Sequence, residues 1–159
     1  GRFFYAYCMY YQLIEITIHF VKSYIFMYKH GDQSSLIVSD GYFTIDDINS
    51  LGNNAFGNLS FVYLGACETG AGQANANNLV NAFNKGADTV LGFTIEVNIA
   101  ETNFWTENFM TNIAEGDTIQ AAIVAADLAI FKDATLGKRQ NYSVYSRYIA
   151  GNFNMAPVQ

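Results

Sequence analysis

The stretch FVYLGACETGAGQ, residues 61–73, decides the fold of this 159-residue chain. Its first half, from Phe61 to Ala66, is a continuous apolar run of the kind that forms a strand buried on both faces. Cys67 ends that run, and the glycines around it allow a tight passage of the chain and close approach by a ligand backbone. The stretch therefore predicts a central strand that delivers a thiol to a functional loop.

The chain downstream of Cys67 predicts a helix, because apolar residues recur at i, i+3, i+4 and i+7 in the set Ala76, Leu79, Val80 and Phe83. Further elements are predicted at these ranges: a strand at 89–93, helices at 99–114 and 118–131, and a strand at 143–149. The helix at 118–131 is apolar nearly all round, so we expect it to be well buried.

Upstream of Cys67 the sequence predicts strands. One has alternating apolar and polar residues, and another is a continuous apolar run. Residues 14–20 alternate with a period of two, and the apolar run at 25–28 stops just before His30. Thr44 precedes a short helix as its N-cap, with Asp47 at the third helical position. A hairpin turning at Asp40–Gly41 lies between His30 and that helix.

Strands that alternate with helices across short connections predict an α/β fold, a mostly parallel sheet with helices on both faces. No linker or repeat appears, so residues 1–159 are interpreted as one domain, and an N-terminus that is cut short is compatible with this interpretation. In such sheets the working site lies beyond the carboxyl ends of the strands. The ends that carry chemically useful residues are those at His30 and Cys67.

Composition excludes several classes of protein. Apolar residues make up 51% of the chain, which excludes disorder, and the net charge of −6 with eight Lys plus Arg leaves no basic stripe for nucleic acid. Glu15, His19 and Lys22 interrupt the apolar N-terminal stretch, so no membrane span or signal peptide is predicted.

No cluster has metal-ligand spacing, and no cofactor is expected. Two cysteines, Cys8 and Cys67, can form at most one bridge, and we expect thiols.

His30 and Cys67 are the residue types of a nucleophile and its general base. A thiol near a helix N-terminus lies in a positive field that favours the thiolate. The separation of 37 positions between the two residues suffices for a hairpin and a helix, so parallel neighbouring strands would present both at one rim. Each residue also has an ordinary interpretation, since a lone Cys is often a small buried apolar residue and a lone His a surface residue.

Three segments together resemble a known family: HGDQSSLIVSDGYFTIDDI at 30–48, FVYLGACETGAGQ at 61–73 and NLVNAFNKGADTVLGFT at 78–94. They look like the caspase-like (clan CD) cysteine peptidases, closest to the CHAT-type and clostripain/gingipain-like branches. The resemblance implies a three-layer caspase-like fold and hydrolysis of peptide or protein substrates. It further implies His30 as the base, Cys67 as the nucleophile, and the backbone amides of Gly31 and Cys67 as oxyanion donors.

The sequence departs from parts of that pattern. The Gln-Ala-Cys-x-Gly signature of true caspases is absent. Relatives that cleave after Arg or Lys often carry an Asp two residues before the Cys, where this chain has Gly65. Asp32 and Glu68 could line the substrate pocket beside Gly65. The resemblance therefore predicts no strong preference for Arg or Lys before the scissile bond.

Two other functions stay open from the sequence. A caspase-like domain without activity could serve as a scaffold or interaction module. A nucleotide-binding domain would use the glycines after the strand at residues 61–66, but no Lys-Ser/Thr follows them and no GxGxxG pattern forms.

Overall fold

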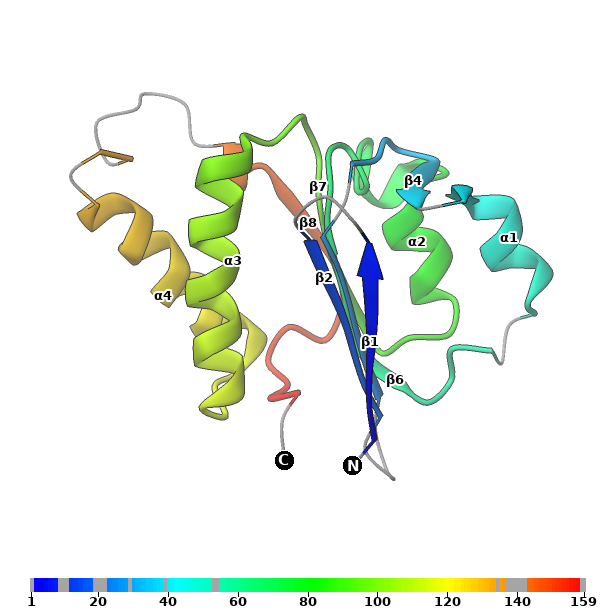
Figure 1. Ribbon diagram of the computed structural model, residues 1–159, viewed down its shortest axis with the longest axis horizontal. Coiled ribbons are helices and arrows are strands. Elements are labelled where there is room, and N and C mark those ends of the chain that lie inside the picture. The colour runs from blue at the N-terminus through cyan, green and yellow to red at the C-terminus, as the bar shows by residue number, and fades with distance from the viewer. Residues whose placement is uncertain are drawn as a thin grey trace. The chain divides into compact units, whose positions relative to one another are not determined.

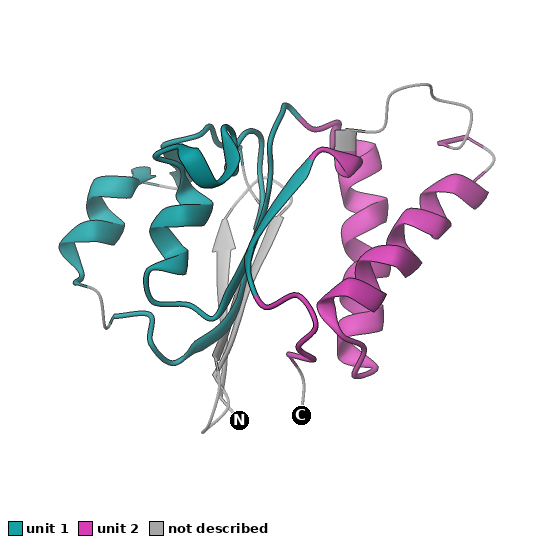
Figure 2. Ribbon diagram, turned by 180° about the vertical axis from the view of Figure 1, so that it is seen from behind, with its two compact units in different colours: residues 1–96, 147–151 teal, residues 97–146, 152–159 magenta. Residues whose placement is uncertain are grey.

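The computed structural model describes residues 2–8, 12–18, 23–28, 30–38, 40–52, 55–133, 135–136 and 143–157. The chain forms two compact units, coloured separately in Figure 2. The first comprises residues 1–96 and 147–151, and the second comprises residues 97–146 and 152–159.

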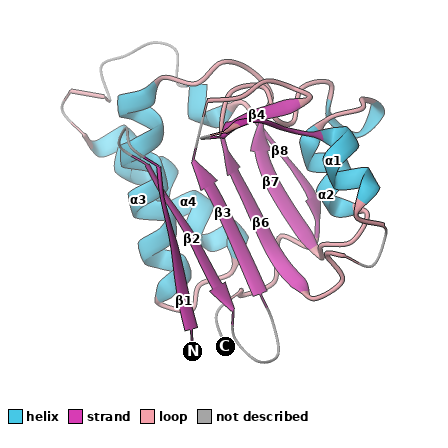
Figure 3. Cartoon of the chain, turned by 45° about the vertical axis from the view of Figure 1, so that its right-hand side comes forward, coloured by secondary structure: helices cyan, strands magenta, loops and turns pink. Residues whose placement is uncertain are grey.

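The main sheet of the first unit has, within the described ranges, six strands in the order β1-β2-β3-β6-β7-β8 (Figure 3). They are β1 Arg2–Cys8, β2 Gln12–Ile18, β3 Ser23–Tyr28, β6 Leu59–Gly65, β7 Thr89–Phe93 and β8 Arg147–Gly151. The pairs β3–β6 and β6–β7 are parallel, whereas β1–β2, β2–β3 and β7–β8 are antiparallel.

The sheet is therefore mixed, and the prediction of a mostly parallel sheet is wrong. Only a few residues separate β1 from β2 and β2 from β3, and a parallel connection needs a dozen or more. The α/β class is confirmed, because strands and helices alternate along the chain. The three-layer arrangement stays a prediction.

The strand β6 forms the centre of the core, since all seven of its residues are buried. Val62, Leu64 and Ala66 belong to the apolar cluster that also includes the apolar residues of α2, Leu79–Asn84. Truncating a fully buried leucine such as Leu64 to alanine typically costs about 2–5 kcal/mol of unfolding free energy. The strand that carries Cys67 at its end is thus held in the best-packed part of this unit.

The hairpin and helix between β3 and β6 match the sequence closely. The hairpin consists of β4, Ser35–Val38, and β5, Gly41–Thr44, and α1 follows at Ile45–Ser50 (Figure 1). Asp47 N–H donates to Thr44 Oγ1, while the Thr44 N–H donates to the Asp47 carboxylate at 2.7 Å. This reciprocal capping box confirms the predicted start of the helix.

The helix predicted after Cys67 begins later than its apolar pattern indicates. Residues 67–72 form turns, a 3₁₀ turn spans Gln73–Asn75, and α2 begins only at Leu79. Glu68 and Gln73 have positive φ values of 56° and 53°, which an α-helix does not tolerate. The Asn78 side chain accepts the Asn81 N–H and caps α2.

The second unit contains α3, Ile99–Ala114, and α4, Ile119–Lys132, both at the predicted ranges. Trp105 is fully buried in α3 and donates from Nε1 to Asp127 Oδ1 of α4 at 2.7 Å. The expectation that α4 is buried all round is wrong, because Val124, Leu128 and Phe131 are 51%, 49% and 71% exposed. An apolar sequence does not by itself exclude a solvent-facing stripe on a helix.

The last predicted strand, 143–149, is displaced toward the C-terminus. A 3₁₀ turn spans Ser143–Tyr145, and β8 begins at Arg147. None of the helices in the described ranges has the length and hydropathy that crossing a membrane requires.

Candidate functional site

The two candidate catalytic residues follow neighbouring parallel strands. In the β3–β6 register Tyr28 lies opposite Gly65, and each of these residues ends its strand. His30 and Cys67 each lie two residues beyond that pair. The predicted parallel neighbourhood of these strand ends is confirmed, and it places His30 and Cys67 at the same end of the sheet.

The residues next to His30 and Cys67 pack against each other. A Cβ built on Gly31 would lie 3.2 Å from the Ala66 Cβ, 2.8 Å from the Ser35 carbonyl oxygen and 2.9 Å from a Leu36 methyl. A side chain at position 31 would therefore separate these segments. Glycine is needed here for close approach, not for a positive φ.

The loops beyond the two strands are hydrogen-bonded to each other. Leu79 N–H donates to the Gln33 carbonyl at 3.0 Å, and Gln33 Nε2 donates to the Asn77 carbonyl at 3.2 Å. The loop after His30 is thus bound to the segment that follows Cys67. No periodic pattern in the sequence predicts the contact between Gln33 and Asn77, because it joins loop residues 44 positions apart.

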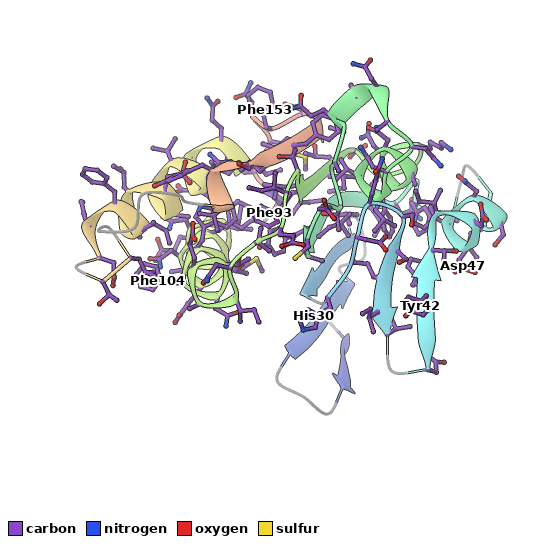
Figure 4. The ribbon with its side chains drawn as sticks, turned by 90° about the horizontal axis from the view of Figure 1, so that it is seen from above. His30, Tyr42, Asp47, Phe93, Phe104 and Phe153 are labelled. Atoms are coloured by element: carbon purple, nitrogen blue, oxygen red, sulfur yellow. The ribbon has the colours of Figure 1, made fainter. Side chains whose placement is uncertain are left out.

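The backbone around Gly31 is extended and pairs with β4. Ile37 N–H donates to the His30 carbonyl at 2.8 Å, and Asp32 N–H donates to the Ser35 carbonyl at 2.9 Å. Successive amides of an extended chain alternate in direction, so the Gly31 N–H points away from β4. The side chain of His30 is exposed, and Figure 4 shows it on the same part of the molecule as the hairpin residue Tyr42.

Cys67 is half-buried at the end of the buried strand β6. The next residue, Glu68, adopts a left-handed backbone conformation with φ 56°. Its N–H donates to the Ile95 carbonyl at 3.1 Å, and Gly70 N–H donates to the Phe93 carbonyl at 2.8 Å. The surrounding chain thus holds a backbone conformation that non-glycine residues rarely adopt, a kind of strain often found at functional sites.

The helix-dipole argument for Cys67 does not apply to this structure. The residue lies twelve positions before the start of α2, and turns occupy the intervening segment. Any activation of the thiol must therefore have another source, and His30 is the candidate base. The side chain of Cys8 lies outside the described residues, and Cys67 is present as a thiol.

The Asp32 side chain stabilises a turn. Among the described residues it makes no hydrogen bond to the imidazole of His30. Its Oδ1 accepts the backbone N–H groups of Ser34 and Ser35 at 2.7 and 2.8 Å and both their hydroxyls at 3.0 and 3.1 Å. Desolvation raises the pKa of Asp32, but these hydrogen bonds outweigh it and lower the pKa overall from its ordinary value.

The remaining pocket candidates occupy different environments. Gly65 is buried in the last position of β6, and Glu68 is half-buried beside Cys67. In the part of the chain that the structure describes, no group of three or more His, Cys, Asp or Glu residues could hold a metal ion.

Sequence reasoning missed Thr69, a fully buried polar residue two positions after Cys67. The signal that could have found it is a hydroxyl residue four positions after the end of a strand buried on both faces, since a buried hydroxyl needs hydrogen-bond partners.

Comparisons with known proteins agree with the fold. A family model described as the CHAT domain matches residues 16–146. The crystal structure of the Arg-specific cysteine proteinase gingipain R (RGPB) is similar with a TM-score of 0.65 and 13% identity over 84% of this chain. The chain spans only 33% of the length of that gingipain chain. The comparison with curated proteins found no match.

Proposed function

The chain belongs to the CHAT domain family and has a caspase-like fold, and from this premise we propose that it is a cysteine endopeptidase with His30 and Cys67 as its catalytic dyad. The observation that carries the proposal is the register that sets Tyr28 opposite Gly65 on parallel strands. It brings a histidine and a cysteine from distant parts of the sequence to one end of the sheet. The contact between Gly31 and Ala66 supports the same juxtaposition.

The chemistry assigned to the pair is thiol-dependent hydrolysis of a peptide bond. The Cys67 sulfur attacks the scissile carbonyl carbon after the His30 ring takes up the thiol proton. The C–N bond then breaks, and the His30 ring gives its proton to the leaving amine. Water, deprotonated by His30, hydrolyses the thioester and regenerates the thiol. Such proton transfers by a positioned histidine typically contribute about 10²–10⁴-fold in rate.

Backbone amides supply the proposed stabilisation of the transition state. We assign the N–H groups of Gly31 and Cys67 to the developing oxyanion, and a donor of this kind is typically worth ~3 kcal/mol. The Gly31 N–H makes no hydrogen bond to another described residue and points away from β4, which supports its availability to a substrate.

The Arg specificity in the name of gingipain R is not assigned to this chain. The position two residues before Cys67 is Gly65, which has no carboxylate to pair with a cationic substrate side chain. Burying Lys or Arg without such a partner costs desolvation energy that nothing offsets. Of the other residues assigned to the proposed pocket, Asp32 is already engaged by the Ser34 and Ser35 donors and Glu68 adjoins the nucleophile. We therefore propose no strong preference for Arg or Lys before the scissile bond.

Labelling with an electrophilic peptide probe tests the proposed function. A peptidyl acyloxymethyl ketone should modify Cys67 in the folded protein, and the Cys67→Ala variant should lose both labelling and peptide hydrolysis. The matched control is Cys8→Ala, which removes the other thiol of the chain and should keep both. A folded wild-type protein that is neither labelled nor active would instead favour a scaffold domain without catalysis.

A further inference from the structure

Thr69 forms a buried hydrogen-bonded link beside Cys67. Its side chain is completely inaccessible to solvent. The hydroxyl lies 3.3 Å from the carbonyl oxygens of both Leu64 and Ala66, which share its single proton, and it accepts the Phe93 N–H at 3.2 Å. One hydroxyl thus connects the end of β6 with the end of β7.

The bond to Ala66 bears on the proposed reaction. The Ala66 carbonyl and the Cys67 N–H belong to the same peptide group, which is planar, and in its trans form the two point in opposite directions. Holding the carbonyl oxygen therefore sets the direction of the N–H. We propose that Thr69 is a positioning residue that aims the Cys67 N–H at the oxyanion by holding the Ala66 carbonyl. This inference rests on the proposed function.

The neighbouring strand leaves room for this hydroxyl. Gly92 of β7 pairs with Leu64 of β6, and a Cβ built on Gly92 would lie 2.5 Å from Thr69 Oγ1 and 2.6 Å from a Val80 methyl. Any side chain at position 92 would displace Thr69 or Val80. Gly92 and Thr69 therefore form one unit, in which the missing side chain of the first accommodates the hydroxyl of the second.

A Thr69 side chain that only packs and one that orients the Cys67 N–H affect different reactions of Cys67. Alkylation of Cys67 by iodoacetamide forms the S–C bond as iodide leaves, and no oxyanion develops. A peptide aldehyde adds the Cys67 sulfur to its carbonyl carbon, and the carbonyl oxygen of the resulting hemithioacetal occupies the oxyanion position. Loss of a correctly aimed amide weakens only the second reaction.

The experiment compares Thr69→Val, which keeps the shape but removes the hydroxyl, with Thr69→Ser, which keeps the hydroxyl. The probes are iodoacetamide and a tripeptide aldehyde with the sequence of the best-cleaved library peptide. We expect Thr69→Val to bind the aldehyde about 10- to 100-fold more weakly and to lose kcat by a similar factor, with KM and the alkylation rate within about twofold of wild type. Thr69→Ser should restore aldehyde binding.

Equal aldehyde affinity in wild type and Thr69→Val would overturn the inference. So would a parallel loss of aldehyde binding and alkylation, because that pattern indicates a general disturbance of the loop. If Thr69→Val does not fold, Gly92→Ala displaces the hydroxyl without deleting a hydrogen-bonding group, and the same split between probes is expected. A folded wild-type protein that cleaves no peptide and binds no aldehyde would refute the proposed function, and the inference with it.

Discussion

Gly31 and Ala66 approach so closely that a Cβ on the glycine would lie 3.2 Å from the Cβ of the alanine. Each of these residues is the immediate neighbour of a candidate catalytic residue, Gly31 of His30 and Ala66 of Cys67. The close approach therefore connects the two halves of the proposed site directly beside the candidate catalytic residues.

Replacing Gly31 with alanine should separate those halves. The new methyl group would meet the Ser35 carbonyl at 2.8 Å and Leu36 at 2.9 Å as well as Ala66. Overpacking of this kind typically costs about 1–3 kcal/mol, so urea unfolding should show a lower midpoint. The rate of peptide hydrolysis should fall by more than the loss of folded protein explains. The control is Gly52→Ala, which also destabilises the fold because Gly52 has a positive φ of 80°, but whose added Cβ meets nothing within 4 Å. It should lower the urea midpoint without the additional loss of activity.

Asp32 should make the stability of the protein dependent on pH. Because its pKa is lowered in the folded state, the ionised carboxylate stabilises the fold above its ordinary pKa of 3.8. That contribution should be lost as the pH falls through the lower folded-state value. Chemical unfolding at several pH values should show Asp32→Asn less stable than wild type at pH 7, with the difference disappearing in strong acid.

The comparison for Asp32 is Asp46→Asn, which removes the same charge from a side chain that makes no hydrogen bond to another described residue. A stability difference that is as large for Asp46→Asn as for Asp32→Asn would show that the Ser34 and Ser35 bonds are not its cause.

Substrate selection should not favour basic residues. The absence of a carboxylate at Gly65 removes the charge-assisted contact that would offset desolvation of Lys or Arg. A peptide library incubated with the protein should give a cleavage profile without a strong preference for Arg or Lys. A profile dominated by Arg or Lys, and abolished by Asp32→Asn or Glu68→Gln, would show that another carboxylate replaces the one missing at position 65.

Local features of the fold were predictable from the sequence. Thr44 and Asp47 are three residues apart, and the capping box depends only on their own side chains and backbone N–H groups. The buried strands at 61–66 and 89–93 were evident from continuous apolar runs. The shared end of β3 and β6 also followed, since a hairpin and a helix between two buried strands allow a parallel return.

Features set by longer-range contacts were not predictable. The apolar spacing from Ala76 to Phe83 indicated one helix, but the positive φ at Gln73 and the cap at Asn78 leave only Leu79–Asn84 helical. The hydrogen bonds of Thr69 join carbonyls of β6 to an amide of β7, and no local pattern encodes such partners. The antiparallel directions of β1, β2 and β3 depend on which strands pair across the short connections between them.

The central claim is that His30 and Cys67 act as a pair, and the alkylation rate of Cys67 tests it most directly. Iodoacetamide labelling of the folded protein at pH 7, quantified by mass spectrometry for each cysteine, should show Cys67 reacting much faster than Cys8. His30→Gln should slow the labelling of Cys67 at least about tenfold, because the imidazole no longer takes up the thiol proton, and leave Cys8 unchanged. Equal rates for Cys67 in the folded wild type and folded His30→Gln would contradict the account.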